Sequence, residues 1–188
     1  MKAPSSQRAE EAQGSAAPSA WVARFAPLVP AGAQVLDLAC GGGRHSRLFL
    51  ERGYAVTAVD RDLSRLGELA RHPQVQALEI DLEDGRPFRL SGRSFAAVVV
   101  TNYLYRPLLS HLVRAVAEGG LLIYETFAVG NERFGRPANP AYLLTPGELL
   151  AAVGGRLRVL AYEDTIVDSP KPAAVQRIAA RREAATAG

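Results

Sequence analysis

The alternation of short apolar segments with amphipathic ones is the feature of this sequence that most constrains its fold. Five segments have the length and apolar content of buried strands, at residues 34–39, 54–59, 75–80, 95–100 and 121–126. Strands that alternate with helices build a parallel, doubly wound sheet with helices on both faces. Residues 157–163 and 174–181 are two further predicted strands, joined by a loop too short for a helix, and should form an antiparallel hairpin. The sequence thus predicts a three-layer α/β fold with a mostly parallel, seven-stranded sheet.

Capping residues and apolar spacing place helices between these strands. Asp62 is positioned to cap a helix whose leucines lie on one face. Pro107 suits the first turn of another helix, which is expected to end at Gly119 and Gly120. Residues 145–148, Thr-Pro-Gly-Glu, form a capping box, so a further helix should begin there.

Length and composition indicate a single globular domain. The chain has 188 residues, of which 48% are hydrophobic and 22% charged, an ordinary composition for a protein that buries its own core. Residues 2–20 contain no Leu, Ile, Val or aromatic side chain, so they bury too little surface to offset their ordering entropy. We therefore expect a disordered N-terminal tail over residues 1–20, a folded domain over 21–183 and a disordered end over 184–188.

Charge, cysteine content and apolar runs indicate the setting and the partners. The formal net charge is +3, with basic residues spread along the chain, which gives no support to nucleic-acid binding. The longest apolar run, residues 95–100, is far too short to span a bilayer, and the N-terminus does not read as a secretory signal. Cys40 is the single cysteine, which excludes an internal disulfide and fits a cytoplasmic location. We expect a cytoplasmic monomer or homodimer without membrane or nucleic-acid partners.

A glycine-rich turn after the first predicted strand marks the expected ligand site. Ligands of doubly wound sheets bind at the carboxyl ends of strands, and residues without a Cβ let a ligand touch the backbone. A P-loop is excluded, because Gly43 is followed by Arg-His-Ser and not by Lys and Ser or Thr. Gly41, Gly43 and Ser46 match two of the three glycines of a dinucleotide site, so a nicotinamide cofactor stays open. S-adenosylmethionine, which has a ribose and a zwitterionic tail but no phosphate, is the third candidate.

Three acidic residues near the ends of consecutive predicted strands help to separate these ligands. Asp60 ends the second strand, where a carboxylate accepts hydrogen bonds from the ribose hydroxyls of either cofactor. Asp37 lies shortly before Gly41, and an anion there repels a pyrophosphate but suits an ammonium and a sulfonium. Asp81 ends the third strand, where it can accept from an exocyclic amine such as that of adenine. The three acids therefore favour S-adenosylmethionine.

The stretch VLDLACGGGRHSRLFLERGYAVTAVDRD resembles the first motifs of class I S-adenosylmethionine-dependent methyltransferases. Within that class, the chain is most similar to small bacterial enzymes grouped with the tellurite-resistance methyltransferases, over residues 21–182. The resemblance implies a Rossmann-like methyltransferase fold ending in an antiparallel hairpin, with S-adenosyl-L-methionine as cofactor. The cofactor-binding residues that it implies are Asp37, Ala39, Gly41 and Gly43 at the methionine portion, Asp60 at the ribose with Arg61 next to it, Asp81 and Leu82 at the adenine, and Asn102 beside the methyl group.

The segment after the fourth predicted strand bears on the methyl acceptor. It reads Thr-Asn-Tyr-Leu-Tyr-Arg-Pro-Leu and lacks the Asn/Asp-Pro-Pro-Tyr-type motif often found in family members that methylate amines of nucleic acids or glutamine. We therefore expect in-line displacement onto a small molecule, such as a thiol, an oxyanion or a metabolite. Tyr103 and Glu125 are candidate catalytic residues, and Tyr103, Arg106, Glu125 and Arg133 are candidate acceptor-binding residues. Residues 127–144 form a long loop that is a candidate lid.

Two other functions stay open at this point. One is an NAD(P)-dependent oxidoreductase with a degenerate glycine loop, against which Asp37 and the final hairpin argue. The other is a non-catalytic module that binds S-adenosylmethionine without turnover. No Cys, His and carboxylate residues have metal-ligand spacing, so no metal site is expected. Trp21 is interpreted either as a core residue or as a cover over the cofactor, and His45 either as a ligand contact or as a helix-surface residue.

Overall fold

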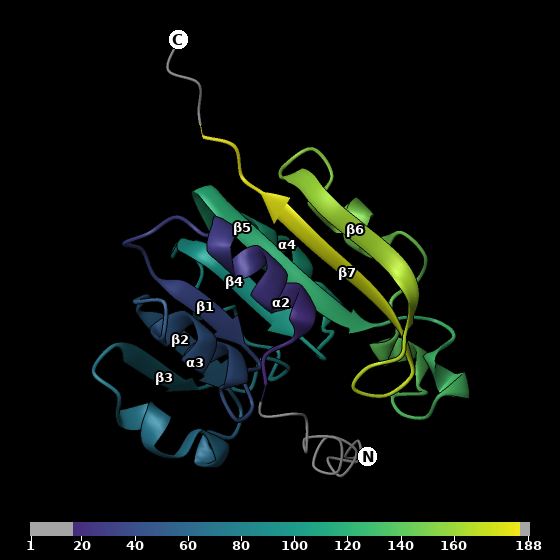
Figure 1. Ribbon diagram of the computed structural model, residues 1–188, viewed down its shortest axis with the longest axis horizontal. Helices are drawn as coiled ribbons and strands as arrows, with labels where there is room; N and C mark the ends of the chain where they lie inside the picture. Colours follow the sequence, from purple (N-terminus) through teal and green to yellow (C-terminus); the bar gives the residue numbers. More distant parts are fainter. Residues whose placement is uncertain (1–16, 185–188) are drawn as a thin grey trace.

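The computed structural model describes residues 17–184, which fold around one seven-stranded sheet. The strands are β1 (Val35–Leu38), β2 (Val56–Asp60), β3 (Val75–Glu79), β4 (Phe95–Thr101), β5 (Val116–Phe127), β6 (Arg158–Val167) and β7 (Ala173–Arg181). Their order is β3-β2-β1-β4-β5-β7-β6, with β1 to β5 parallel and β7 antiparallel to both of its neighbours (Figure 1). The predicted fold, including its antiparallel final pair, is confirmed.

Helices cover both faces of the sheet, so the molecule has three layers (Figure 1). One face carries α2 (Ala20–Phe25), the 3₁₀ helix η1 (Ala26–Leu28), α3 (Arg44–Leu50) and the 3₁₀ helix η2 (Ser64–Arg71). The other face carries the 3₁₀ helix η3 (Arg106–Leu108), α4 (Leu109–Arg114) and α5 (Glu148–Val153). Each face has its own apolar core, with Trp21 and Phe49 buried in the first and Phe95 and Leu112 in the second.

The central strands β1 and β4 are buried on both sides because their sequences are almost entirely apolar. All residues of β1 are buried, and so are all residues of β4 except the last. In a parallel sheet the carboxyl ends of the strands meet at one edge, where ligands bind. The ends of β1 to β5 form this edge here, and it is called the carboxyl edge below.

The helix that was expected to end at Gly119 and Gly120 ends earlier, and both glycines belong to β5. A Cβ on Gly120 would lie 2.9 Å from the backbone oxygens of Ala96 and Ala117. The pairing of β4 with β5 is also irregular near this point. The glycines therefore allow a close backbone approach between strands, and the predicted helix stop is wrong.

Two other predicted helices differ at their starts. Asp62 Oδ1 accepts from the N–H of Ser64 at 2.9 Å and so makes a turn ahead of η2. Gly67 then takes φ 57° and ψ −129°, which breaks the expected α-helix into short 3₁₀ turns. In the capping box, the Glu148 carboxylate accepts from the N–H of Thr145 at 2.9 Å as expected, but α5 begins only at Glu148.

Helix α2 begins just before the predicted start of the folded domain. Ser19 is its N-cap, and the Ser19 hydroxyl accepts from the backbone N–H of Trp21 at 3.1 Å. The rest of the predicted tail, residues 1–16, and residues 185–188 at the other end lie outside the described residues. Within residues 17–184, no helix combines the length and the apolar character needed to cross a bilayer.

Candidate functional site

Asp60, at the end of β2, is bonded to the glycine turn that follows β1. Its Oδ2 accepts from the backbone N–H of Gly41 at 2.8 Å, and its Oδ1 accepts from the N–H of Asp62 at 3.2 Å. Ala39 and Gly41 both have φ +53°, a left-handed conformation that costs free energy at Ala39. The hydrogen bond to Asp60 therefore fixes a sharply bent turn next to a carboxylate at the carboxyl edge.

The outer glycines of the turn have different surroundings, although we predicted that both line the methionine portion of the cofactor. A Cβ on Gly41 would meet no atom within 4 Å, so the space beside its backbone is open. A Cβ on Gly43 would lie 2.5 Å from Leu69 Cδ2 and 2.7 Å from Leu66 Cδ2. Gly43 therefore lets η2 pack against the turn, whereas Gly41 leaves room for a ligand.

A small cavity opens at the carboxyl ends of β2 and β3. Its walls are Ala39, Asp60, Arg61, Ile80, Asp81, Leu82, Glu83 and Tyr103. These walls include the residues that we predicted at the ribose and the adenine. Asp81 is exposed, and its Oδ1 accepts from the N–H of Glu83 at 2.9 Å. A larger hollow, lined by residues that include Gly155 and Arg182, lies at the end of β7 that is far from the carboxyl edge. It contains none of the predicted site residues.

Asp37 lies beneath the glycine turn, outside the open cavity, and is 1% exposed. Its Oδ2 accepts from the backbone N–H and the hydroxyl of Ser46, at 2.9 and 2.6 Å. Burial raises the pKa of Asp37 to about 6, although the hydrogen bonds from Ser46 act in the opposite direction. The predicted ligand to the cofactor ammonium thus anchors α3 to β1 in the structure.

His45 is buried and does not lie on the helix surface. Its Nε2 accepts from the backbone N–H of Ser19 at 3.1 Å, and its Nδ1 lies 4.0 Å from Asp37 Oδ1. Burial and, to a smaller extent, the charge of Arg44 together lower the pKa of His45 to about 3. A neutral imidazole therefore joins α3 to the start of α2.

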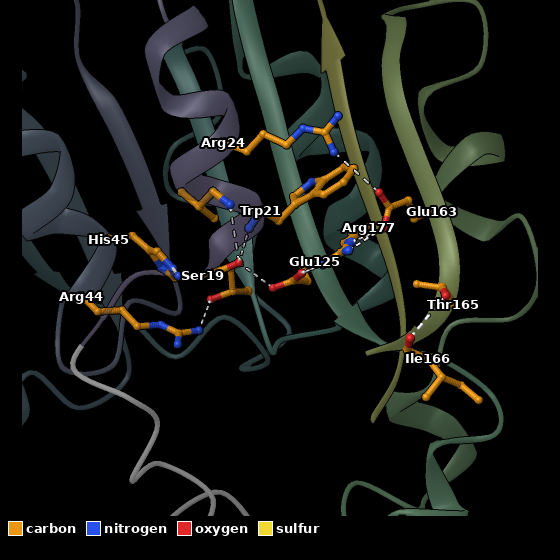
Figure 2. A network of polar contacts seen from close by, with 12 residues as sticks. Ser19, Trp21, Arg24, Arg44, His45, Glu125, Glu163, Thr165, Ile166 and Arg177 are labelled. Atoms are coloured by element: carbon orange, nitrogen blue, oxygen red, sulfur yellow. Dashed lines mark hydrogen bonds and ion pairs between the residues drawn. The ribbon is translucent and has the colours of Figure 1, made fainter. Parts of the chain in front are cut away.

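Glu125, a predicted catalytic residue, lies at the end of β5 and has two partners from distant parts of the chain (Figure 2). Its Oε1 accepts from the hydroxyl of Ser19 at 2.7 Å, and its Oε2 accepts from Arg177 at 3.2 Å. Its side chain keeps 15% of its surface exposed. The carboxylate is therefore held in one orientation at the carboxyl edge.

Arg177 extends this network from β7 to β6 (Figure 2). Its guanidinium donates to Glu163 Oε2 from Nε at 2.8 Å and from a terminal nitrogen at 2.5 Å. It also lies 4.8 Å from the centroid of the Trp21 ring, and that ring packs on Phe25 at 4.8 Å. Trp21 is 2% exposed. Of its two interpretations, the structure supports the core residue.

The residues after β4 divide between the surface and the core. Asn102 is exposed with φ +53°, and its N–H donates to the Glu125 backbone oxygen at 3.0 Å. Tyr103 is 4% exposed, and its carbonyl accepts from the hydroxyl of Tyr124 at 2.8 Å. The side chain of Asn102 is therefore available at the carboxyl edge, whereas Tyr103 contributes to the wall of the cavity.

Arg106 and Arg133, which we predicted to bind the acceptor, both contact the long loop. Arg106 pairs with Glu148 Oε1 at 2.7 Å and donates to the carbonyl oxygens of Ala141 and Leu143, each at 2.8 Å. Arg133 is exposed and donates to a carbonyl of its own loop at 3.2 Å. Arg106 therefore fastens the end of the long loop to α5.

The long loop contains two 3₁₀ turns, η4 (Asn131–Arg133) and η5 (Pro140–Tyr142), and is also anchored near its start. Asn131 is 1% exposed. Its Nδ2 donates to the Pro137 carbonyl at 3.0 Å, and its Oδ1 accepts from the N–H of Ala174 at 3.3 Å. The loop is thus tied to β7 at one end and to α5 at the other.

Sequence reasoning missed Ser19 and Arg177 as the partners of Glu125. Ser19 falls in a segment without Leu, Ile, Val or aromatic residues, so no sequence pattern marked it as structured. Arg177 interrupts an apolar strand, just as Glu125 does. Two oppositely charged residues that interrupt apolar strands were therefore the sequence signal from which this ion pair could have been predicted.

Known proteins resemble this chain in sequence over about half of its length. A family described as a methyltransferase domain matches residues 35–120. The malonyl-[acyl-carrier protein] O-methyltransferase of Salmonella typhimurium is 35% identical over 104 residues, which are 53% of this chain and 41% of that protein. The chain therefore spans about two fifths of the length of this curated relative.

Solved structures resemble the chain over nearly its whole length. TehB from Haemophilus influenzae superposes with a TM-score of 0.70 at 17% identity, covering 93% of this chain and 65% of TehB. The 1,6-didemethyltoxoflavin-N1-methyltransferase of Burkholderia thailandensis, solved with S-adenosylhomocysteine, gives 0.68 at 21% identity and covers 94% and 82%. At these identities the likeness is one of fold. The matched segment contains the glycine turn, Asp60 and Asp81, and the sheet has the same architecture, so the chain carries a segment similar to a methyltransferase domain within the fold of these methyltransferases.

Proposed function

We propose that the protein transfers the methyl group of S-adenosylmethionine to a small-molecule acceptor. The observation that carries the proposal is the hydrogen bond from Gly41 to Asp60, which places a carboxylate beside an open glycine turn at the carboxyl edge. The match of residues 35–120 to a methyltransferase domain supports the reaction class.

The residues of the carboxyl edge fit this cofactor, which supplies a methyl group activated by a sulfonium. A ligand can lie against Gly41, where a Cβ would meet no protein atom within 4 Å. We assign Asp60 to the ribose hydroxyls, and Asp81 with Leu82 to the adenine, because the three residues line one cavity. Asp37 is buried, so we assign it to hold α3 in place and to add negative charge below the turn.

The acceptor is assigned to the ends of β4 and β5, next to the glycine turn. Glu125 accepts hydrogen bonds from Ser19 and Arg177, one at each oxygen. We therefore assign Glu125 to orient the acceptor together with Asn102. Alignment of two reactants can supply roughly 7–11 kcal/mol of the barrier reduction, so positioning alone is a sufficient task for these residues.

The names of two similar proteins support an acceptor other than a nucleic acid, whereas a third, the ribosomal RNA small subunit methyltransferase H of Gemmatimonas aurantiaca, matches only 23% of this chain. One is an O-methyltransferase of malonyl-[acyl-carrier protein], and the other methylates a nitrogen of 1,6-didemethyltoxoflavin. The accepting atom is an oxygen in one protein and a nitrogen in the other, so the panel of acceptors that tests the proposal must include several kinds of accepting atom. An oxidoreductase is a weaker proposal, because the matched family is a methyltransferase domain.

The test uses the full chain with S-adenosylmethionine labelled on the transferable methyl group. Thiols, carboxylates, selenium and tellurium oxyanions and nitrogen heterocycles serve as acceptors, and reactions without acceptor serve as controls. We expect labelled product from at least one class of small molecule. Binding of S-adenosylhomocysteine without label transfer to any of them would contradict the proposal and support a non-catalytic binding module.

A further inference from the structure

Arginines gather around the hollow at the edge of the sheet opposite to the carboxyl edge, where β6 begins and β7 ends (Figure 1). The hollow has a volume of about 440 Å³, and its lining includes Arg156, Arg158 and Arg182. Among the described residues that line it, Leu157 alone has an apolar side chain. The hollow therefore suits a polar ligand better than an apolar one.

Two arginines stand opposite each other on neighbouring strands beside the hollow. Arg158 pairs with Arg181 in the register of β6 and β7, and like charges directly opposite each other destabilise a sheet. Glu183 forms an ion pair with Arg158. One terminal nitrogen of Arg181 donates to the Leu28 carbonyl at 3.3 Å, but its buried Nε has no hydrogen-bond partner within residues 17–184. One carboxylate thus serves two arginines.

Arg182 and Arg156 add two guanidinium groups that also lack a carboxylate partner. Arg182 donates to the carbonyl oxygens of Val116 and Val113, at 2.6 and 2.7 Å. These bonds fix its guanidinium against the end of α4 and the start of β5, but a neutral carbonyl does not cancel its charge. Arg156 is exposed, and its side chain makes no hydrogen bond or ion pair in the part of the chain that the structure describes.

The cluster carries more positive charge than its acids neutralise. The ion pair of Arg158 with Glu183 is neutral, so three guanidinium groups remain for one further lining carboxylate, that of Glu118. Elsewhere in the described chain an arginine that joins two elements has its own acid, as Arg106 has Glu148. The surplus of two positive charges beside a hollow favours a bound dianion.

We infer that this arginine cluster, formed by Arg156, Arg158, Arg181 and Arg182, binds the phosphate group of a small ligand. The guanidinium fork matches the oxygens of phosphate, and a tetrahedral phosphate accepts from donors that approach from several directions. The group belongs either to inorganic phosphate or to a phosphomonoester, for whose remaining atoms the hollow has room. Because the cluster lies at the edge opposite to the carboxyl edge, the inference does not rest on the proposed function.

The test follows backbone amides of the full chain by proton–nitrogen correlation NMR at about pH 7.5, where phosphate is mainly a dianion. Inorganic phosphate, glycerol 3-phosphate and malonate are titrated at constant ionic strength, with chloride as the reference anion. The proteins are wild type, Arg156→Gln and Arg181→Gln. Arg71→Gln is the matched control, because Arg71 is likewise exposed and without a side-chain partner among the described residues. Thermal unfolding verifies that each variant folds.

We expect saturable shifts of the amides of residues 155–158 and 181–183 with inorganic phosphate, and none with chloride. Arg156→Gln and Arg181→Gln should each weaken phosphate binding about tenfold, whereas Arg71→Gln should not change it. Malonate, a dicarboxylate of the same charge, should bind about tenfold more weakly than phosphate. Tighter binding of glycerol 3-phosphate would identify a phosphomonoester as the ligand, and equal binding would identify inorganic phosphate.

Three results would overturn the inference. They are equal phosphate affinity in wild type and Arg156→Gln, malonate binding as tight as that of phosphate, and shifts that chloride reproduces. The titrations are repeated with saturating S-adenosylhomocysteine, which should leave phosphate binding unchanged. Displacement of phosphate by S-adenosylhomocysteine would place the anion at the carboxyl edge and also refute the site. Failure of wild type to bind S-adenosylhomocysteine would contradict only the proposed function, and the phosphate titration would still decide the site.

Discussion

The backbone N–H of Gly41 donates to Asp60 Oδ2 at 2.8 Å, so the turn after β1 and the end of β2 form one unit. This contact crosses from one strand to the next at the carboxyl edge. It leaves Asp60 half-buried and the space beside Gly41 open. The ligand site proposed here depends on this pair more than on any other.

The two outer glycines of the turn should respond differently to a methyl group. Gly43→Ala places its Cβ 2.5 Å from Leu69 Cδ2, so we expect a loss of about 2 kcal/mol or more in the free energy of unfolding. Gly41→Ala meets no protein atom, and its left-handed backbone costs only about 1 kcal/mol. Its methyl group would however occupy the proposed ligand space. We expect Gly41→Ala to weaken S-adenosylhomocysteine binding at least tenfold.

Urea unfolding and calorimetry on the two variants separate these effects, and each variant is the control for the other. If Gly41→Ala bound S-adenosylhomocysteine as wild type does, the turn would not be the contact surface for the cofactor.

The buried pair of Asp37 and His45 should make stability insensitive to acid over a defined range. The pKa of Asp37 rises from 3.8 to about 6 on folding, and that of His45 falls from 6.5 to about 3. Between about pH 4 and 6, the folded state thus holds its proton on Asp37 and the unfolded state on His45. Both states bind the same number of protons, so the pair adds no slope to the free energy of unfolding.

Single substitutions should expose the two opposite slopes. In Asp37→Asn only the unfolded state takes up a proton, at His45, so stability should fall as the pH drops below about 6.5. In His45→Gln only the folded state does so, at Asp37, so stability should rise as the pH drops below about 6. Each slope approaches about 1.4 kcal/mol per pH unit. Urea unfolding between pH 4 and 7 measures them, and identical profiles for both variants would refute the assignment.

We expect the main role of Arg106 to be stabilising the long loop and not binding a ligand. Arg106→Gln removes the pair with Glu148 and the bonds to Ala141 and Leu143. We expect faster hydrogen exchange of residues 139–145 and a loss of about 1 kcal/mol in stability, because the pair is partly exposed to solvent. Arg133→Gln, on the same loop, is the control and should change neither. Unchanged exchange together with a raised KM for the acceptor would instead support the acceptor-binding role predicted from sequence.

The fold could be predicted from sequence because its central strands are largely apolar runs and the segments between the first five strands have helical patterns. The run that forms β4 and the pair that forms β6 and β7 were assigned from local pattern alone. The same reasoning gave wrong helix predictions around Gly67 and Gly120. Gly67 breaks a helix by its dihedral angles, and Gly120 serves a close contact between strands, and neither property has a local sequence signal.

The site could be predicted only in part, for a related reason. Asp60, Asp81 and the glycine turn follow strands directly, so topology alone brings them to one edge. The burial of Asp37 under α3 and the contact of Ser19 with Glu125 depend on how helices dock on the sheet. Docking is set by packing over long sequence distances, which the spacing of residues does not encode.

The most direct measurement is calorimetric titration of S-adenosylhomocysteine and of NADH into wild type, Asp60→Ala and the exposed control Asp164→Ala. Two hydrogen bonds from ribose to a carboxylate are each worth about 1.5–3 kcal/mol, so Asp60→Ala should weaken binding by about a hundredfold or more. We predict that wild type and Asp164→Ala bind S-adenosylhomocysteine equally and do not bind NADH. Binding of NADH without S-adenosylhomocysteine, or equal S-adenosylhomocysteine affinity in Asp60→Ala, would contradict the assignment of this site.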